Sequence, residues 1–138
     1  QVLQPEYNLY DRDGFEGALQ DLTVRENIGV VTYYSLASGF LSGKYRSESD
    51  LGQSQRGSGI AKYLNPRGFA IIKALETVAE KHQVKPAEVA LAWLIHQPGV
   101  TAPIASATKV AHIDGFATAL SLNLSADDIA ALTKAGTV

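Results

Sequence analysis

Short apolar segments that resemble β-strands alternate with segments of helical period along this chain, and this alternation most constrains its fold. Strands are expected at residues 1–7, 28–34 and 100–104, where β-branched and apolar residues run together. Helices are expected at residues 15–27, 67–82, 85–96 and 109–120, and in a last segment capped by Ser125. Strands that alternate with helices favour a parallel sheet built from βα units, so the predicted fold class is α/β.

Three parallel strands leave two sheet edges with unpaired backbone groups and apolar side chains. The chain also contains no methionine, and it begins at Gln1 directly before an apolar segment. Both observations predict that residues 1–138 form a single partial domain, cut from a longer polypeptide. Loss of only a few residues from a native amino terminus is the alternative explanation for the missing methionine.

The composition excludes several classes of function. With 46% hydrophobic and 19% charged residues, the chain resembles an ordinary soluble domain. A net charge of −2 gives no reason to expect nucleic acid or an anionic membrane as a partner, and the longest apolar run, residues 89–95, is too short to span a bilayer. The absence of cysteine excludes disulfides and thiol catalysis, and it fits a cytoplasmic location. The three histidines do not have the spacing of metal ligands, so no metal site is expected.

A loop of small residues, 33–46, follows the second expected strand and contains Lys44. Small residues let backbone N–H groups approach an anion closely, and a lysine adds a point charge, so this loop is expected to bind phosphate. It is not a P-loop, because Gly39 stands one residue too close to Gly43 and Tyr45 replaces the Ser or Thr that would bind magnesium. The G-x-G-x-x-G fingerprint of a Rossmann site is also absent.

Four blocks of sequence carry a resemblance to a known family. They are Gln4-Pro5-Glu6-Tyr7-Asn8-Leu9-Tyr10, the loop 33–46, Pro86-Ala87-Glu88-Val89-Ala90-Leu91-Ala92-Trp93, and Pro103-Ile104-Ala105-Ser106-Ala107-Thr108. In this order and at these spacings they resemble the aldo-keto reductases, in particular the bacterial branch related to potassium-channel β subunits. The resemblance covers essentially the whole chain. It implies the carboxy-terminal half of a (β/α)8 TIM barrel, with strands six to eight and their helices, and hence a fragment of the full barrel.

The resemblance implies NADP(H) as the cofactor, bound across the carboxyl ends of the strands. Gln4 would bind the nicotinamide carboxamide, and Tyr33 would stack on the nicotinamide ring. The pyrophosphate would be contacted by Leu36, Ala37, Ser38 and Gly39, neutralised by Lys44 and covered by Arg56. Ser106, Thr108 and Lys109 would receive the adenosine 2′-phosphate at the start of a helix.

The sequence departs from the family pattern at two places. Tyr34-Ser35 stands where Ser-Pro is usual after the stacking aromatic residue. His112, Gly115 and Phe116 stand where the family often has Gln and then Glu-Asn beside the adenine. Both the contacts to adenine and the preference for NADP over NAD depend on this second place.

The family's catalytic tetrad of Asp, Tyr, Lys and His comes from the amino-terminal half, and no segment here matches it. No catalytic residue is therefore expected in this chain, which alone should be inactive. The intact protein would reduce a small aldehyde or ketone to an alcohol, with the missing half of the barrel as a partner. Two alternatives stay open: a non-catalytic nucleotide-binding accessory subunit, and a half-barrel that completes its sheet by self-association.

Overall fold

The computed structural model describes residues 1–53 and 57–137. Its strands β1 (Val2–Leu3), β2 (Gly29–Thr32) and β3 (Ala102–Pro103) form a parallel sheet in the order β1-β2-β3. Val2 pairs with Gly29, and Val31 pairs with Ala102. The predicted α/β class and parallel strand order are therefore present in the structure.

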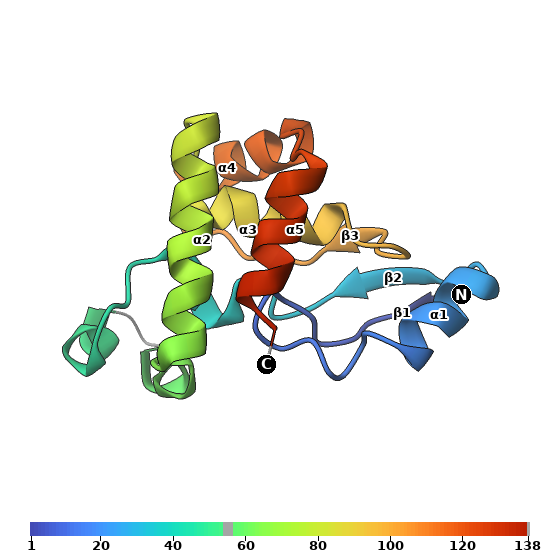
Figure 1. The fold of residues 1–138 in the computed structure, drawn as a ribbon, viewed down its shortest axis with the longest axis horizontal. Helices are drawn as coiled ribbons and strands as arrows, with labels where there is room; N and C mark the ends of the chain where they lie inside the picture. Colours follow the sequence, from blue (N-terminus) through green and yellow to red (C-terminus); the bar gives the residue numbers. More distant parts are fainter. Residues whose placement is uncertain (54–56, 138) are drawn as a thin grey trace.

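Helices alternate with these strands along the chain (Figure 1). They are α1 (Ala18–Arg25), α2 (Pro66–His82), α3 (Pro86–Ile95), α4 (Val110–Ser121) and α5 (Ala126–Ala135). In its described residues, the long connection between β2 and α2 contains the short 3₁₀ segments η1 (Ala37–Ser42), η2 (Glu48–Gln53), η3 (Gly57–Gly59) and η4 (Ala61–Tyr63). No helix in the described parts of the chain is both long and apolar enough to cross a membrane.

Two helix ends follow the capping rules closely. Asn65 precedes Pro66, and its side-chain oxygen accepts the Gly68 N–H at 2.9 Å, which fixes the start of α2. Ser125 caps α5, as predicted, because its hydroxyl accepts the Asp128 N–H at 3.1 Å. The Asp128 carboxylate in return accepts the Ser125 N–H at 3.1 Å, so the two residues form a capping box.

The first helix differs from the prediction of residues 15–27. It begins at Ala18, because Gly17 has φ of 89° and cannot continue a right-handed helix. Phe15 therefore lies in the preceding turn, where it is fully buried. Leu22 has helical spacing from Phe15 in the sequence, yet it is 38% exposed, and Thr23 is the buried residue of α1. Phe15 lies outside the helix and so does not define its inner face.

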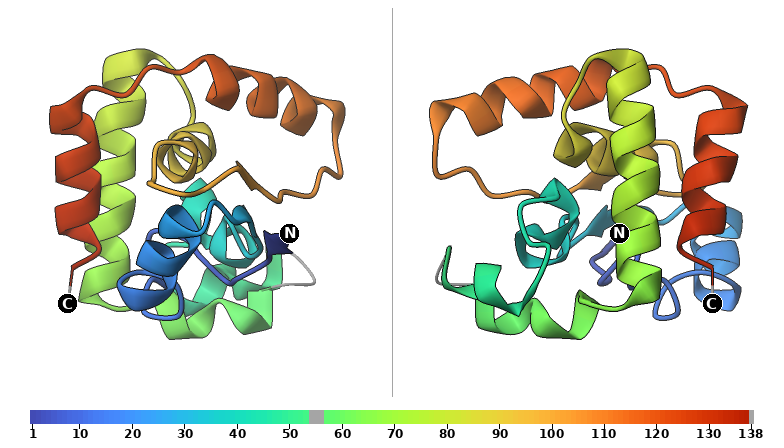
Figure 2. Two further views of the ribbon diagram at one scale, coloured as in Figure 1. Left: turned by 90° about the vertical axis from the view of Figure 1, so that its right-hand side faces the viewer. Right: turned by 60° about the vertical axis from the view of Figure 1, so that its left-hand side comes forward.

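Helix α3 lies between the sheet and the antiparallel pair α2 and α5 (Figure 2). Its residues 89–94 are all buried, which explains why it is hydrophobic on every face. Trp93 is fully buried in the core. Its ring centroid lies 5.5 Å from that of Tyr7, so α3 packs directly against the segment that follows β1.

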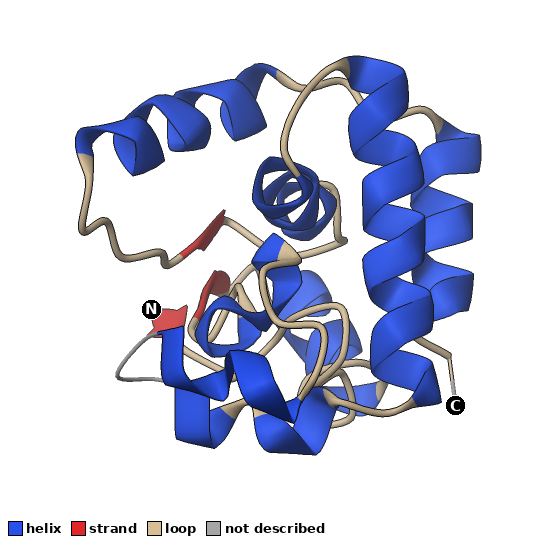
Figure 3. Cartoon of the chain, turned by 90° about the vertical axis from the view of Figure 1, so that its left-hand side faces the viewer, coloured by secondary structure: helices blue, strands red, loops and turns tan. Residues whose placement is uncertain are grey.

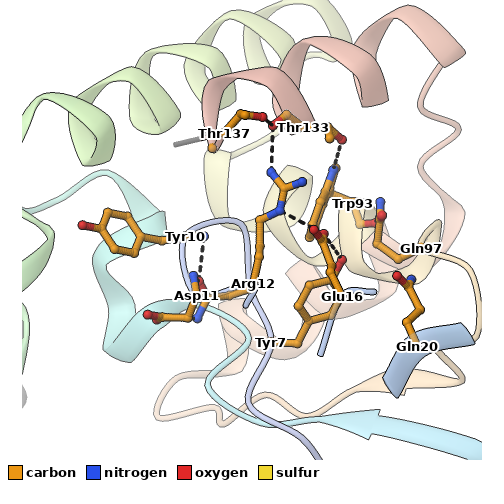
Figure 4. A network of polar contacts seen from close by, with 12 residues as sticks. Tyr7, Tyr10, Asp11, Arg12, Glu16, Gln20, Trp93, Gln97, Thr133 and Thr137 are labelled. Carbon is orange, nitrogen blue, oxygen red and sulfur yellow. Dashed lines mark hydrogen bonds and ion pairs between the residues drawn. The ribbon is translucent and has the colours of Figure 1, made fainter. Parts of the chain in front are cut away.

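A polar network links this core to the surface (Figure 4). The Tyr7 hydroxyl donates to a Glu16 carboxylate oxygen at 2.6 Å, and the Arg12 Nε donates to the same oxygen at 2.9 Å. Burial, together with this bond to Glu16, raises the pKa of Tyr7 far above its usual value, so the hydroxyl stays a donor. Arg12 also donates to the Thr133 carbonyl at 2.8 Å, which ties the turn after β1 to α5.

Helix α4 and the loop before it form an arm that reaches away from α2 and α5 and back to β3 (Figure 3). Along one stripe of α4, Val110 is 80%, Ile113 55% and Leu120 73% exposed. Val2 on the edge strand β1 is 68% exposed. Helix α4 and the outer strand therefore leave apolar side chains uncovered in this chain.

Candidate functional site

A cavity of about 960 Å³ lies at the carboxyl ends of β2 and β3, between the loops that follow them and the first turns of α3 and α4. Such a position is where barrel and open-sheet proteins bind ligands, and the volume is in the range of small-molecule sites. Of the residues predicted to bind the cofactor, the cavity is lined by Tyr33, Leu36, Ser38, Gly39, Lys44, Ser106 and Thr108. The structure thus brings together residues more than 60 positions apart in the sequence.

Tyr33 lies at the end of β2 and is held there by two backbone hydrogen bonds. Its N–H donates to the Pro5 carbonyl at 3.0 Å, and its own carbonyl accepts the Tyr7 N–H at 3.2 Å. The side chain is 38% exposed and lines the cavity. Its ring centroid is 5.6 Å from that of Tyr34, so two aromatic rings stand at this end of the site.

The loop after Tyr33 has an unusual backbone. Tyr34, Ala37 and Ser38 have φ of 56°, 50° and 59°, and Gly39 has φ of 98°. Left-handed conformations cost energy for residues with a Cβ atom and persist only where the surroundings hold them. Ser38 and Gly39 line the cavity, so the short side chains that the sequence predicts for an anion-binding loop do face the site.

Lys44 is exposed and lines the cavity. Its Nζ lies 5.1 Å from the centroid of the Tyr45 ring, and that ring is fully buried. The neighbouring Arg46 is engaged elsewhere, since its guanidinium donates to the Gly43 carbonyl at 2.7 Å and pairs with Glu76 on α2. Lys44 rather than Arg46 is therefore placed to neutralise an anion in the cavity.

The other wall of the cavity is the loop between β3 and α4. Ser106 and Thr108 line it, and the Thr108 N–H donates to Nδ1 of His112 at 3.2 Å. His112 also lines the cavity and so lies beside the residues predicted to hold a phosphate. Its Nδ1 must be unprotonated to accept this bond, which leaves Nε2 to carry the proton of the neutral ring.

Three of the predicted site residues that the structure describes do not line the cavity. Ala37 is fully buried, and Gln4 and Lys109 are exposed outside the cavity. Arg56 lies outside the described residues. A role for these four residues in cofactor binding stays a prediction, as it does for the seven that line the cavity.

The sequence pattern assigns no site role to the start of α3, yet this segment lines the cavity with Lys85, Ala87, Glu88 and Leu91. Glu88 caps α3 by accepting the Lys85 N–H at 2.9 Å. A Cβ atom on Gly115 would lie 3.2 Å from Glu88 Oε1, so glycine at this place lets α4 approach α3 closely. Glycine at position 115, which departs from the family pattern, therefore has a packing reason. The start of a helix at Lys85-Pro86 was the sequence signal that could have indicated the part of the cavity formed by α3.

Within residues 1–53 and 57–137, no three His, Cys, Asp or Glu side chains lie together in a way that could hold a metal ion. A parallel α/β unit with a ligand-sized cavity at the carboxyl ends of its strands is instead typical of barrel proteins that bind an organic ligand. Residues 1–137 match the aldo/keto reductase family as a whole. The chain belongs to the aldo-keto reductase family.

Individual relatives agree with this assignment. The chain is 32% identical to a probable aldo-keto reductase 1 of Glycine max, over 97% of the chain and 39% of that protein. It is 32% identical to a probable voltage-gated potassium channel subunit beta of Arabidopsis thaliana, over 81% of the chain and 36% of the relative. The predicted resemblance to both groups is thus confirmed.

A solved structure shares the fold. The thermostable aldo-keto reductase Tm1743, determined with the inhibitor epalrestat, superposes with a TM-score of 0.71 at 23% identity. The match covers 98% of this chain and 39% of that protein. The chain thus spans about two fifths of the length of the relatives that it matches.

Proposed function

We propose that this chain is the carboxy-terminal, cofactor-binding part of an NADP(H)-dependent aldo-keto reductase, with β1, β2 and β3 as strands six to eight of the barrel. The cavity carries this proposal. It joins an accessible aromatic ring at Tyr33, a small-residue loop at 38–39, a cation at Lys44 and hydroxyl groups at Ser106 and Thr108. An extended dinucleotide needs this set of partners, in the order ring, pyrophosphate and 2′-phosphate.

The residues present fit such a cofactor. Tyr33 offers a ring for stacking against nicotinamide, and Ser38 and Gly39 have no long side chains that would keep a pyrophosphate away. Lys44 would offset the charge of the pyrophosphate. NADPH, when bound, supplies a hydride to a carbonyl carbon. The residues of this chain would bind the cofactor, orient the nicotinamide ring and keep water from one of its faces.

The acid that protonates the carbonyl oxygen would come from the amino-terminal half of the barrel. We expect the amino-terminal half to cover the stripe of α4 and the edge strand β1, because both leave apolar side chains exposed in this chain. The greater part of each matched relative lies outside the match, which is enough chain to cover them. The intact protein would then reduce small aldehydes or ketones to alcohols.

The purified 138-residue chain is expected to bind NADPH and to reduce no aldehyde. Binding is measured from the change in NADPH fluorescence, and turnover from the loss of absorbance of NADPH in the presence of 4-nitrobenzaldehyde. Turnover by the pure chain would contradict the assignment of the catalytic acid to another part of the protein. A folded chain without NADPH binding would contradict the proposed function itself.

Replacing Lys44 by glutamine is expected to weaken NADPH binding by about tenfold, because one charge-assisted contact to phosphate is lost. Lys73→Gln is the matched control, since it removes the same charge at an exposed position on α2 that does not line the cavity. It should change the Kd by less than about threefold, as expected for a screened surface charge. Equal losses in the two variants would show that only the overall charge matters.

Two other functions have support of their own. The similarity to a potassium channel subunit beta favours an accessory subunit that senses the nucleotide. Turnover of simple aldehydes by the intact protein would indicate a reductase, and the absence of turnover would indicate such a subunit. The exposed apolar stripe of α4 also suits a half-barrel that self-associates, and a chain that sediments as a monomer at high concentration would argue against this.

A further inference from the structure

We propose that Asn8 is a positioning residue that sets the turn between the nicotinamide end of the site and the phosphate loop. This inference rests on the proposed function, because it assigns the turn at Tyr34 to cofactor binding. Asn8 does not line the cavity and would not touch the cofactor. It acts through the backbone of Tyr34, the residue between Tyr33 and the loop that Ser38 and Gly39 complete.

The side chain of Asn8 is fully buried and uses its hydrogen-bonding capacity completely. Its Oδ1 accepts the N–H groups of Tyr10 and Asp11, both at 2.8 Å. Its Nδ2 donates to the Tyr34 carbonyl at 2.9 Å and to an Asp11 carboxylate oxygen at 3.1 Å. An asparagine amide has two donor hydrogens and an oxygen with two lone pairs, so all four are engaged. The orientation of the amide is therefore fixed.

Tyr34 needs this support because its φ of 56° is unfavourable for a residue with a large side chain. Its carbonyl accepts two bonds, from Asn8 Nδ2 at 2.9 Å and from the Ala37 N–H at 2.9 Å. The second bond closes the turn that leads into the left-handed residues 37–39. Loss of the Asn8 donor would therefore let the Tyr34 peptide rotate, which moves both Tyr33 and the start of the phosphate loop.

The neighbouring hydroxyls do not replace this support. Ser35 is buried, and its Oγ donates to the Thr32 carbonyl at 3.1 Å, which secures the end of β2 rather than the Tyr34 carbonyl. Among the hydrogen bonds of the described residues, the Tyr34 carbonyl receives only one from a side chain, and that side chain is Asn8. A carboxylate could not replace this amide, because an ionised carboxylate has no hydrogen to donate.

Asn8→Asp tests the inference with a nearly isosteric change. The variant keeps an oxygen for the Tyr10 and Asp11 N–H groups and loses the donor to Tyr34. NADPH should bind about tenfold more weakly, as expected for one lost buried hydrogen bond. Adenosine 2′,5′-bisphosphate is the second probe, because it lacks the nicotinamide and would use the Ser106–Thr108 end of the cavity. Its Kd should change by less than about twofold. Asn8→Ala, which introduces no buried charge, carries the same two expectations.

Asn65→Ala is the matched control for lost stability. It removes a second asparagine, the half-buried cap of α2, at a place that does not line the cavity. It should lower the thermal midpoint but leave the Kd of NADPH unchanged. A weakening of both ligands to the same extent by Asn8→Asp would overturn the positioning role and indicate general destabilisation. Absence of NADPH binding by the unaltered chain would instead overturn the proposed function, and this inference with it.

Discussion

Replacement of Trp93 by alanine is expected to lower the free energy of unfolding by about 3–5 kcal/mol, the usual cost of emptying a fully buried tryptophan site. The ring is inaccessible and lies at the centre of α3, where every residue from 89 to 94 is buried. Its Nε1 donates to the Thr133 hydroxyl on α5 at 3.1 Å, and the Arg12 guanidinium lies 5.7 Å above the ring (Figure 4). Removal therefore loses packing and two polar contacts together.

Trp93→Phe separates these contributions. Phenylalanine keeps an aromatic ring beside Tyr7 but has no N–H for Thr133, so a loss of about 1–2 kcal/mol is expected. Urea unfolding followed by circular dichroism measures both variants. If alanine and phenylalanine cost the same, the hydrogen bond to Thr133 rather than ring packing holds α3 against α5. If neither variant loses stability, Trp93 is not part of a packed core.

The order of strands and helices could be predicted from the sequence because each element shows its own period. Three strand-like segments and five helical segments alternate along the chain, and this alternation favours parallel pairing. The exact start of α1 could not be predicted in the same way. The positive φ of Gly17 keeps the residues before it out of the right-handed helix. Phe15 has the spacing of a helical residue in the sequence, although it lies in a turn.

The candidate site was predictable only where its residues follow a strand directly. Tyr33, Lys44 and Ser106 stand in loops after strands, and parallel strands bring such loops to one edge. Lys85 and Glu88 come from the start of a helix, and only the three-dimensional packing of α3 brings them into the cavity. The bond from Asn8 to Tyr34 spans 26 positions and depends on the conformation of both turns, so no local pattern indicates it.

The same packing explains why residues such as Gln4 and Lys109 differ in placement from their neighbours in the sequence. Lys109 directly follows Thr108, which lines the cavity, and Gln4 directly precedes Pro5, whose carbonyl accepts the Tyr33 N–H. Both side chains are nevertheless exposed outside the cavity. A family pattern assigns roles by position along the chain, whereas the side chain's direction is set by the local backbone. Lys44 and Lys109 have the same chemistry, and only the structure distinguishes them.

Replacement of Asp128 by alanine is the second change for which a large loss of stability is expected, about 3 kcal/mol. Its carboxylate is nearly buried, with 6% of the side chain exposed, and accepts from Lys81 Nζ at 2.8 Å. It also bonds to His82 Nε2 at 2.7 Å and joins the end of α2 to the start of α5. Its loss removes the cap of α5 and the partner of the half-buried His82, together with an ion pair to Lys81, whose own side chain is 57% exposed. Asp127→Ala is the control, since this exposed residue lies in the same first turn.

The effect of Asp128 should depend on pH in a definite direction. Burial opposes ionisation, but the hydrogen bonds from Lys81, His82 and Ser125 outweigh it and hold the pKa of Asp128 well below its usual range. A carboxylate whose pKa is lower in the folded state stabilises the fold above its unfolded pKa of about 3.9, and that stability is lost as the pH falls further. The difference in free energy of unfolding between the unaltered chain and Asp128→Ala should thus be complete at pH 6 and shrink below about pH 4.

Urea unfolding at a series of pH values measures this difference. If the difference for Asp128→Ala stays constant down to pH 3, these three partners do not hold the carboxylate in its charged form. If the difference shrinks for Asp128→Ala while Asp127→Ala shows no such change, the junction of α2 and α5 depends on the charge of Asp128.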